Sequence, residues 1–514
     1  FPFLIFSFQV LLAQVKTEAY FGVSGRTDVA KDVKELYDKG IYISGGFEGA
    51  PHHFGWNIKT DINLEFIYDK VMEHDLSTVA QFAATSDENG NIYVTGFTTY
   101  PDQWPFVTKL DSCGNKLWCK ILIYEDEFTN GWGNDIILTV NDKVVVVVTL
   151  IDDEQPADQI IMTHLVGLST SGNVLWKKPY ASRNDYSWIR QPIGNSILKV
   201  NSDFIISGRC YWPYPEDTTH WFLRPLFIGI DSLFNEKWIL PFAPLDSVFG
   251  RAYSSLALND SILMGVGMRR LADPEESGLL MFYNTVGTEL GYYEITKEQI
   301  GPDVSQIYFT DVERTNDSLF ILASPIGINN EYAPHCELIV DTMANIYNSA
   351  IHNSVLGQQK FTKTFDNNFV VIGEVEETKG DKDIYVYKID TNLNDVPFDP
   401  TPHTYDSLCP GGIQSGTIDL TSCFVWTDVS EAPSPGEYYS FIQTIPVKVY
   451  PNPVTEGSVT FEFENTEYLT PPLIPSRMGG TGSGGGNPPH FSVYNIFGQL
   501  IHTERIYRYQ EKAE

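Results

Sequence analysis

The chain has 514 residues, of which 42% are apolar and 13% aromatic, so it is long enough to bury a large core and to form about two to four domains. Its formal net charge is −32, from 66 acidic and 34 basic residues. This charge repels phosphate backbones and anionic lipid surfaces, which excludes nucleic acid as a partner.

The first segment, residues 1–14, is almost entirely apolar up to Leu12 and ends in Ala13-Gln14. This pattern is typical of the apolar region and cleavage site of a secretory signal peptide, here a remnant without its basic start. A buried first strand is the alternative. No segment approaches the 18 or more apolar residues that a membrane-spanning helix needs, so we expect a secreted protein without a transmembrane segment.

Two short patterns then alternate along the chain, seven times each. The first is a turn dipeptide followed by a β-rich run that ends near Gly, at residues 39–46, 89–97, 141–150, 201–209, 259–267, 316–324 and 366–374. The second is an apolar strand, an Asp or its substitute, a Gly/Asn turn and often Trp, at residues 58–66, 108–118, 167–176, 229–238, 282–291, 339–347 and 388–396.

Turn residues such as Asn-Gly between alternating apolar residues indicate β-hairpins, because these residues tolerate the positive φ of tight turns. Each unit is therefore two hairpins, or four antiparallel strands. Seven such units predict an all-β fold, a seven-bladed β-propeller over residues 20–400; a solenoid of hairpins is the alternative. In each blade the first-to-second and third-to-fourth turns share one rim, so every long connection leaves from the opposite rim, which we call the long-loop face.

The long-loop face is where we expect function, because propellers carry their binding residues on loops. Exposed aromatic rings stack on sugars or anchor protein partners. The predicted ligand-binding residues are those of the aromatic connections, which also carry acids: Trp104, Trp132, Tyr211, Trp212, Tyr214 and Trp221. The alternative is that these rings pack against neighbouring loops.

No motif for catalysis is found: the chain lacks HExxH, GxSxG, a P-loop and a GxGxxG after a strand. Clustered histidines such as His52-His53 have no carboxylate at a metal-ligand spacing, and the Asp87 turn lacks the Gly and Glu of a calcium loop. We therefore predict no catalytic residues, no metal and no cofactor.

The stretch from Asp111 through Gly114 to Trp118 resembles the tryptophan-bearing repeat of quinoprotein dehydrogenases, and Trp176 and Trp238 continue it in the next two units. The resemblance implies that the Trp packs between blades and that the Asp caps the turn. It implies no redox chemistry here, because the adjacent cysteines of a quinone site are absent.

The six cysteines show no zinc-binding spacing. Cys113 and Cys119 flank one hairpin turn, and Cys409 and Cys423 flank a short Gly-containing stretch. We expect each pair to form a disulfide in an oxidising compartment.

The last part of the chain is predicted to be a Pro/Gly-rich connector, residues 401–444, and a small β-sandwich, residues 445–514. Two separated motifs here resemble the C-terminal sorting domain (type A) of the type IX secretion system of Bacteroidota. The matching residues are Tyr450, Pro451, Asn452, Pro453, Tyr494, Asn495, Gly498 and Gln499. The resemblance implies an Ig-like fold and recognition by the outer-membrane translocon. Because the family's closing strands have no counterpart here, the domain is expected to be truncated.

Together these patterns predict an exported cell-surface or secreted propeller, without catalysis of its own, that binds a glycan or a protein through the long-loop face. The alternative is a secreted glycosidase or lyase that uses carboxylates at the mouth of the channel.

Overall fold

The structure is a computed structural model that describes residues 16–49, 52–74, 77–99, 102–123, 128–139, 143–152, 160–182, 188–213, 221–242, 249–270, 276–328, 331–352, 355–378, 381–405, 409, 414–427, 447–450, 460–463, 490–494, 500–505 and 512–513. The predicted signal peptide remnant lies outside these residues. The chain divides into two compact units, Phe1–Ala432 and Pro433–Glu514.

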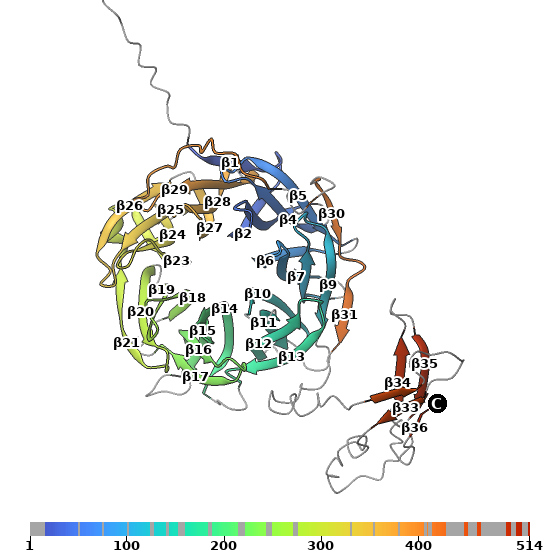
Figure 1. The fold of residues 1–514 in the computed structure, drawn as a ribbon. Helices are drawn as coiled ribbons and strands as arrows, with labels where there is room; N and C mark the ends of the chain where they lie inside the picture. Colours follow the sequence, from blue (N-terminus) through green and yellow to red (C-terminus); the bar gives the residue numbers. More distant parts are fainter. Residues whose placement is uncertain are drawn as a thin grey trace, which may run out of the picture. The chain divides into compact units, whose positions relative to one another are not determined.

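The first unit is a ring of seven sheets, each built on four antiparallel strand positions in radial order from the centre outward (Figure 1). Blade 1 contains β2 (Asp28–Glu35), β3 (Ile41–Glu48), β4 (His53–Thr60) and β5 (Phe66–Glu73), and blade 2 contains β6 (Val79–Ser86), β7 (Ile92–Thr98), β8 (Trp104–Leu110) and β9 (Lys116–Ile123). Blade 3 contains β10 (Asn130–Leu138), β11 (Lys143–Asp152), β12 (Ile160–Ser169) and β13 (Val174–Tyr180), and blade 4 contains β14 (Arg190–Val200), β15 (Asp203–Pro213), β16 (Trp221–Ile230) and β17 (Glu236–Pro241).

The remaining three blades follow the same plan with local changes. Blade 5 contains β18 (Phe249–Ala257), β19 (Ile262–Arg270), β20 (Glu276–Asn284) and β21 (Glu289–Ile295). In blade 6 the inner strand is split into β22 (Val304–Ile307) and β23 (Asp311–Arg314), and the one-turn helix α1 (Lys297–Ile300) precedes β22. The blade is completed by β24 (Phe320–Ile328), β25 (Glu331–Val340) and β26 (Ile346–His352). Blade 7 contains β27 (Val355–Lys363), β28 (Phe369–Thr378), β29 (Asp381–Ile389) and β1 (Glu18–Phe21). The predicted all-β, seven-bladed propeller is confirmed.

The ring closes by combining the two ends of the propeller in one sheet. Strand β1 pairs antiparallel with β29, with Glu18 opposite Tyr387 and Phe21 opposite Ile384. The segment before blade 1 thus supplies the outermost strand of the last blade, so backbone hydrogen bonds hold the chain that leads into the first blade to the last one (Figure 1).

The turns between the third and fourth strands explain the second sequence pattern. Each contains one residue with positive φ, for example 76° at Gly114. In the same turn the Asp111 carboxylate accepts hydrogen bonds from the backbone N–H groups of Cys113 and Asn115, at 2.9 and 2.8 Å. The Asp therefore caps the turn, as the resemblance implied.

The Trp of this pattern packs between blades, also as implied. The Trp118 ring lies against Gly172 in the corresponding turn of blade 3, and the Trp238 ring lies against Gly287 of blade 5. Trp176 contacts Phe234 of blade 4 with a centroid separation of 4.5 Å. These rings are part of the packing that holds neighbouring blades together.

The connector after blade 7 returns to blades 1 and 2 and lengthens their outer edges. Strand β30 (Gly416–Asp419) pairs in parallel with β5, and β31 (Phe424–Thr427) pairs in parallel with β9 (Figure 1). Leu420, between these strands, is buried in the core of blade 2.

The expected cysteine pairing is wrong. The disulfides are Cys113–Cys409 and Cys119–Cys423, so each joins blade 2 to the connector rather than closing a local loop. The reason is the parallel addition of the connector strands, which brings residues about 300 positions apart alongside β9. Cys210 and Cys336 are buried free thiols.

The second unit contains short antiparallel strands. Its described strands form two sheets, one of β32 (Val447–Tyr450), β33 (Thr460–Phe463) and β36 (Lys512–Ala513), the other of β34 (His490–Tyr494) and β35 (Leu500–Arg505). In the part of the chain that the structure describes, no helix is long and apolar enough to cross a membrane.

Candidate functional site: the central cavity

The inner strands of the blades surround a cavity of about 530 Å³ at the centre of the ring. In five blades the inner strand carries a β-bulge near its middle, which interrupts the register with the second strand. The residues at these bulges are Lys31, Phe82, Asn134, Asn195 and Tyr253, and all five line the cavity. A bulge turns an additional side chain out of the regular alternation, and here it points toward the axis of the ring.

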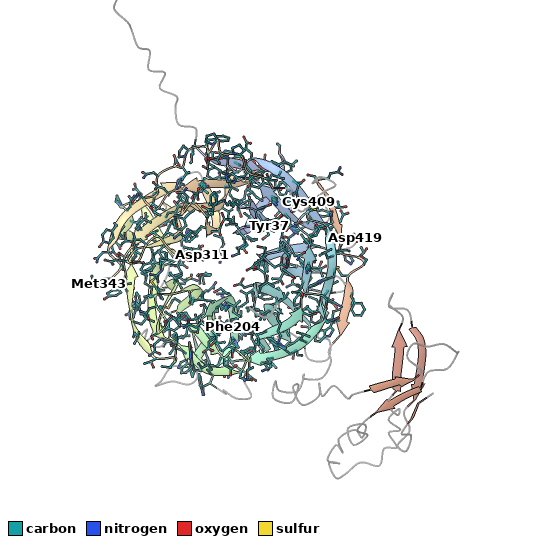
Figure 2. The ribbon with its side chains drawn as sticks, in the orientation of Figure 1. Tyr37, Phe204, Asp311, Met343, Cys409 and Asp419 are labelled. Atoms are coloured by element: carbon teal, nitrogen blue, oxygen red, sulfur yellow. A yellow bond between two sulfur atoms is a disulfide. The ribbon has the colours of Figure 1, made fainter. Side chains whose placement is uncertain are left out.

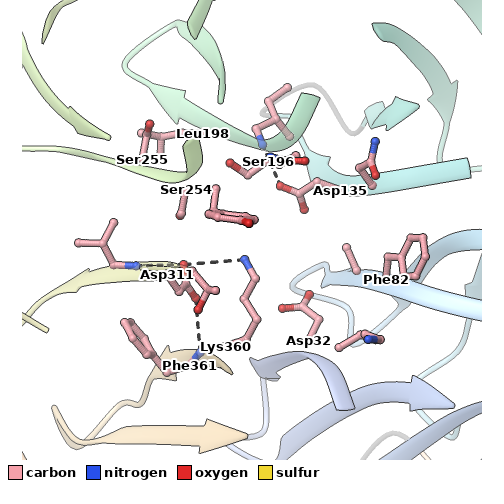
Figure 3. Close-up of a pocket in the computed structure, with 18 of the residues that line it drawn as sticks. Asp32, Phe82, Asp135, Ser196, Leu198, Ser254, Ser255, Asp311, Lys360 and Phe361 are labelled. Atoms are coloured by element: carbon pink, nitrogen blue, oxygen red, sulfur yellow. Dashed lines mark hydrogen bonds and ion pairs between the residues drawn. The ribbon is translucent and has the colours of Figure 1, made fainter. Parts of the chain in front are cut away.

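Asp32 and Asp135 directly follow the bulge residue in blades 1 and 3, and Asp311 begins β23 in blade 6; the side chains of all three reach the cavity (Figure 3). Asp32 accepts a hydrogen bond from the Ala84 backbone N–H of blade 2, at 2.9 Å. Asp135 accepts one from Ile197 of blade 4 at 2.8 Å. The carboxylates therefore join each of these blades to the next one in the ring.

The third aspartate makes the same link. Asp311 accepts a hydrogen bond from the Phe361 backbone N–H of blade 7 at 3.4 Å, and it forms an ion pair with Lys360 at 3.8 Å (Figure 3). Figure 2 shows Asp311 near the axis of the ring. These three aspartates were not singled out in the sequence; the signal was an Asp directly after the bulge residue in two inner strands and at the start of β23 in a third.

The charges in the cavity influence one another strongly. The neighbouring Asp32, whose carboxylate lies 3.5 Å from the Lys34 amine, raises the pKa of Lys34, and Asp135 and Asp311 act in the same direction. Burial raises the pKa of Asp135, although Lys34 and Lys360 oppose this effect. The Lys34 side chain is 42% exposed, and because it lines the cavity, its charge is available to a molecule inside it.

A second set of cations lies toward the long-loop face. Arg209 is just past the middle of β15, on the side of the connection to β16, and Arg251 is near the start of β18. Burial lowers the pKa of Arg209, and the nearby Arg251 lowers it further, so the two guanidinium groups are close enough to repel each other. Both line the cavity with Trp132, whose indole N–H donates a 2.7 Å hydrogen bond to Asn134.

The structure does not gather the predicted aromatic residues into one site. Trp132 lines the cavity, whereas Trp104 is 1% exposed in the core of blade 2. Tyr211 and Trp212 are partly buried at the end of β15, where Trp212 contacts Trp188 edge to face with a centroid separation of 4.2 Å. The guanidinium carbon of Arg190 lies 3.9 Å from the centre of the Trp221 ring. Tyr214 is outside the described residues.

The residues of the sorting motif fall in the second unit. Tyr450 ends β32 and Tyr494 ends β34. Pro451, Asn452, Pro453, Asn495, Gly498 and Gln499 lie outside the described residues. Among the residues that the structure describes, no group of three His, Cys, Asp or Glu side chains is placed to hold a metal ion.

The first unit is thus a seven-bladed β-propeller with a charged central cavity. No family matches the chain, and no curated protein matches it in sequence. Some solved structures are similar to it at a low level. A protein of unknown function from Dyadobacter fermentans DSM 18053 is 10% identical with a TM-score of 0.40, over 63% of this chain and 98% of that one.

Two further solved structures are similar at the same level. A protein of unknown function from Bacteroides caccae is 9% identical with a TM-score of 0.34, over 65% of this chain and 93% of that one. Drosophila semaphorin 1b, extracellular domains 1–2, is 8% identical with a TM-score of 0.40, over 72% of this chain and 86% of that one. At these identities and scores, the comparisons support no inference about function.

Proposed function

We propose that this protein is an exported binding protein whose long-loop face and central cavity bind a glycan. The observation that carries the proposal is the composition of the cavity, where Trp132, Arg209 and Arg251 lie together toward the rim of the long connections. A volume of about 530 Å³ falls in the range of about 300–1,000 Å³ usual for small-ligand sites. A glycan end fits this space, which favours a glycan over a protein ligand.

The alternative, a glycosidase or lyase that uses carboxylates of the channel, is not favoured. Asp32, Asp135 and Asp311 each accept a backbone hydrogen bond from the next blade. Glu313, which also lines the cavity, accepts one from the Arg314 backbone N–H at 3.1 Å. A nucleophile or general acid must be free to approach the substrate, and moving any of these carboxylates would leave a backbone N–H without its partner.

A glycan array with purified protein tests the binding proposal. The Trp132→Ala and Arg251→Ala variants are expected to bind any recognised glycan at least about tenfold more weakly, because they remove a stacking surface and a charged donor. Lys237→Ala is the matched control, since Lys237 is a partly exposed cation of β17 that does not line the cavity. Equal binding by all three variants would show that the cavity is not the site.

The Trp212→Ala and Trp221→Ala variants address the outer part of the long-loop face. If the ligand extends beyond the cavity, these two variants weaken binding as well. Normal binding by both would restrict the ligand site to the cavity and remove these two residues from it.

We further propose export by the type IX secretion translocon, with the second unit as the signal. The support is the pair of separated motifs around Tyr450 and Tyr494. Two disulfides in the first unit are consistent with an extracellular protein. The test is expression of the full chain in a Bacteroidota host with and without the translocon; surface labelling that is equal in both strains would contradict this route.

A further inference from the structure

Two junctions between blades are closed in the same way by a tryptophan. At the junction of blades 2 and 3 the indole N–H of Trp118 donates a 2.9 Å hydrogen bond to the carbonyl oxygen of Thr170. At the junction of blades 4 and 5 the indole N–H of Trp238 donates a 2.9 Å hydrogen bond to the carbonyl of Thr285. In both cases a ring from the outermost strand fills the groove and caps the next turn.

Blade 5 carries no ring at this position. Gly291 of β21 is paired with Phe282 of β20, just as Trp238 of β17 is paired with Gly229 of β16. A Cβ added at Gly291 would meet no atom within 4 Å, so the space that a side chain would take is open. Gly291 also has a φ of 137°, which disfavours any residue with a side chain there.

The result is a socket of about 630 Å³ between blades 5 and 6. Its wall contains the polar Asn259, Arg314 and Asp317 at one side and, over the rest, the apolar side chains of Leu258, Ile262, Phe282, Leu290, Phe320 and Met343. Met343, Leu290 and Tyr293 are 59%, 52% and 44% exposed at its rim. Figure 2 shows Met343 at the outer margin of the ring, where another molecule can approach.

The socket also has the hydrogen-bond acceptor of the filled grooves. Thr342 follows Asp341 in the blade 6 turn, as Thr285 follows Asn284 in blade 5, and Thr342 lines the socket. Among the described residues, no hydrogen bond to the Thr342 carbonyl is recorded, whereas Thr285 accepts the indole of Trp238. The groove therefore has both the apolar wall and the acceptor that an indole ring uses in this protein.

We propose that this socket binds the tryptophan side chain of a partner polypeptide, with its ring against Phe282 and its N–H directed to the carbonyl of Thr342. A polypeptide is favoured because the adjacent strand β21 is the free outer edge of its sheet. In the same ring the outer edges β5 and β9 already accept an added strand, from the connector. The socket is on the outer wall, so the proposal does not depend on glycan binding at the cavity.

The test is a titration of the full-length protein with N-acetyl-5-fluorotryptophanamide, followed by ¹⁹F NMR. A single saturable site is expected. An analogue methylated at the indole nitrogen should bind roughly 2- to 12-fold more weakly, because it lacks one hydrogen-bond donor. A five-residue peptide with a central Trp should bind at least as well as the amide, whereas a peptide that binds more weakly than free indole would overturn a polypeptide partner.

Two matched variants locate the site. Met343→Asp places a charge at the socket rim and should weaken binding on the order of tenfold. Val286→Asp makes the same change at the equivalent position of the blade 5 turn, is exposed, and lies beside a groove that Trp238 already fills, so binding should be unchanged. No binding by the unmodified protein, or an equal loss in both variants, would overturn the proposal.

A third variant should create a second socket. Trp238→Gly empties the groove between blades 4 and 5 and frees the Thr285 carbonyl, so the number of bound rings is expected to rise from one to two. If this variant folds and still binds only one ring, the rule taken from the filled grooves is wrong. If it does not fold, the comparison of Met343→Asp with Val286→Asp decides.

Discussion

The disulfide between Cys119 and Cys423 should control how firmly the connector is attached to the propeller. We consider the double variant Cys119→Ser/Cys423→Ser, in which Cys113–Cys409 stays intact. With that bridge present, the second one closes a loop of only roughly 20 residues, made of the short segments between the two pairs of cysteines. The entropy of closing such a loop corresponds to about 3 kcal/mol, or a roughly 150-fold change in the opening equilibrium of β31.

Hydrogen exchange followed by mass spectrometry measures this equilibrium directly. Amides of β31 should exchange roughly 150-fold faster in the double variant, whereas amides of β29 in the same molecule should not change. The matched control is Cys113→Ser/Cys409→Ser, which keeps the bridge adjacent to β31 and should affect β31 much less. If β31 exchanges at the same rate in the two double variants, the position of each bridge does not control the attachment and the reasoning is refuted.

Three further predictions concern the blades. Asp135→Ala should lower the free energy of unfolding by about 1–3 kcal/mol in urea titrations, because the buried N–H of Ile197 loses its acceptor; Asp135→Asn, which keeps an acceptor oxygen, should cost less, and equal losses would contradict this role. Burial lowers the pKa of His164 to about 3, with a contribution from Lys177. Below pH 6.5 the unfolded chain therefore binds a proton that the folded protein does not, and the free energy of unfolding should fall by up to about 1.4 kcal/mol per pH unit. A His164→Gln variant whose free energy of unfolding has the same pH slope would count against this role. Gly229→Ala places a Cβ 2.1 Å from the Trp238 ring and should cost about 1–3 kcal/mol in thermal unfolding, a loss that should largely vanish in a Trp238→Ala background.

The number of blades was predictable because each turn needs particular residues. An Asp that caps the turn and a residue with positive φ recur at fixed spacing, so local chemistry alone counts the units, as at Asp111 and Gly114. The closing strand β1 was not recognised, because four residues with alternating partial burial carry little pattern of their own. The pairing of β1 with β29 follows only from the closure of the ring, which places the two strands side by side.

The cysteine pairing and the cavity depended on contacts that sequence spacing does not encode. Cys113 and Cys119 look like a local pair, yet the connector approaches both of them from the far end of the propeller. The cavity aspartates were equally hidden, since an Asp inside a strand such as Asp135 looks like any solvated residue until the ring brings the inner strands together. Of the predicted aromatic ligand residues that the structure describes, only Trp132 reaches the cavity, because it alone lies on an inner strand.

The pairing of β1 with β29 has a consequence for biosynthesis and transport. The last sheet cannot be completed until β29, which ends at Ile389, has emerged from the ribosome. Strand β1 must therefore remain unpaired while blades 1 to 6 are synthesised. During that interval the nascent polypeptide exposes unpaired strand edges at both ends of a growing arc, which are sites for misassembly. A holding chaperone, or passage through a membrane before the final sheet assembles, would protect the chain at this stage.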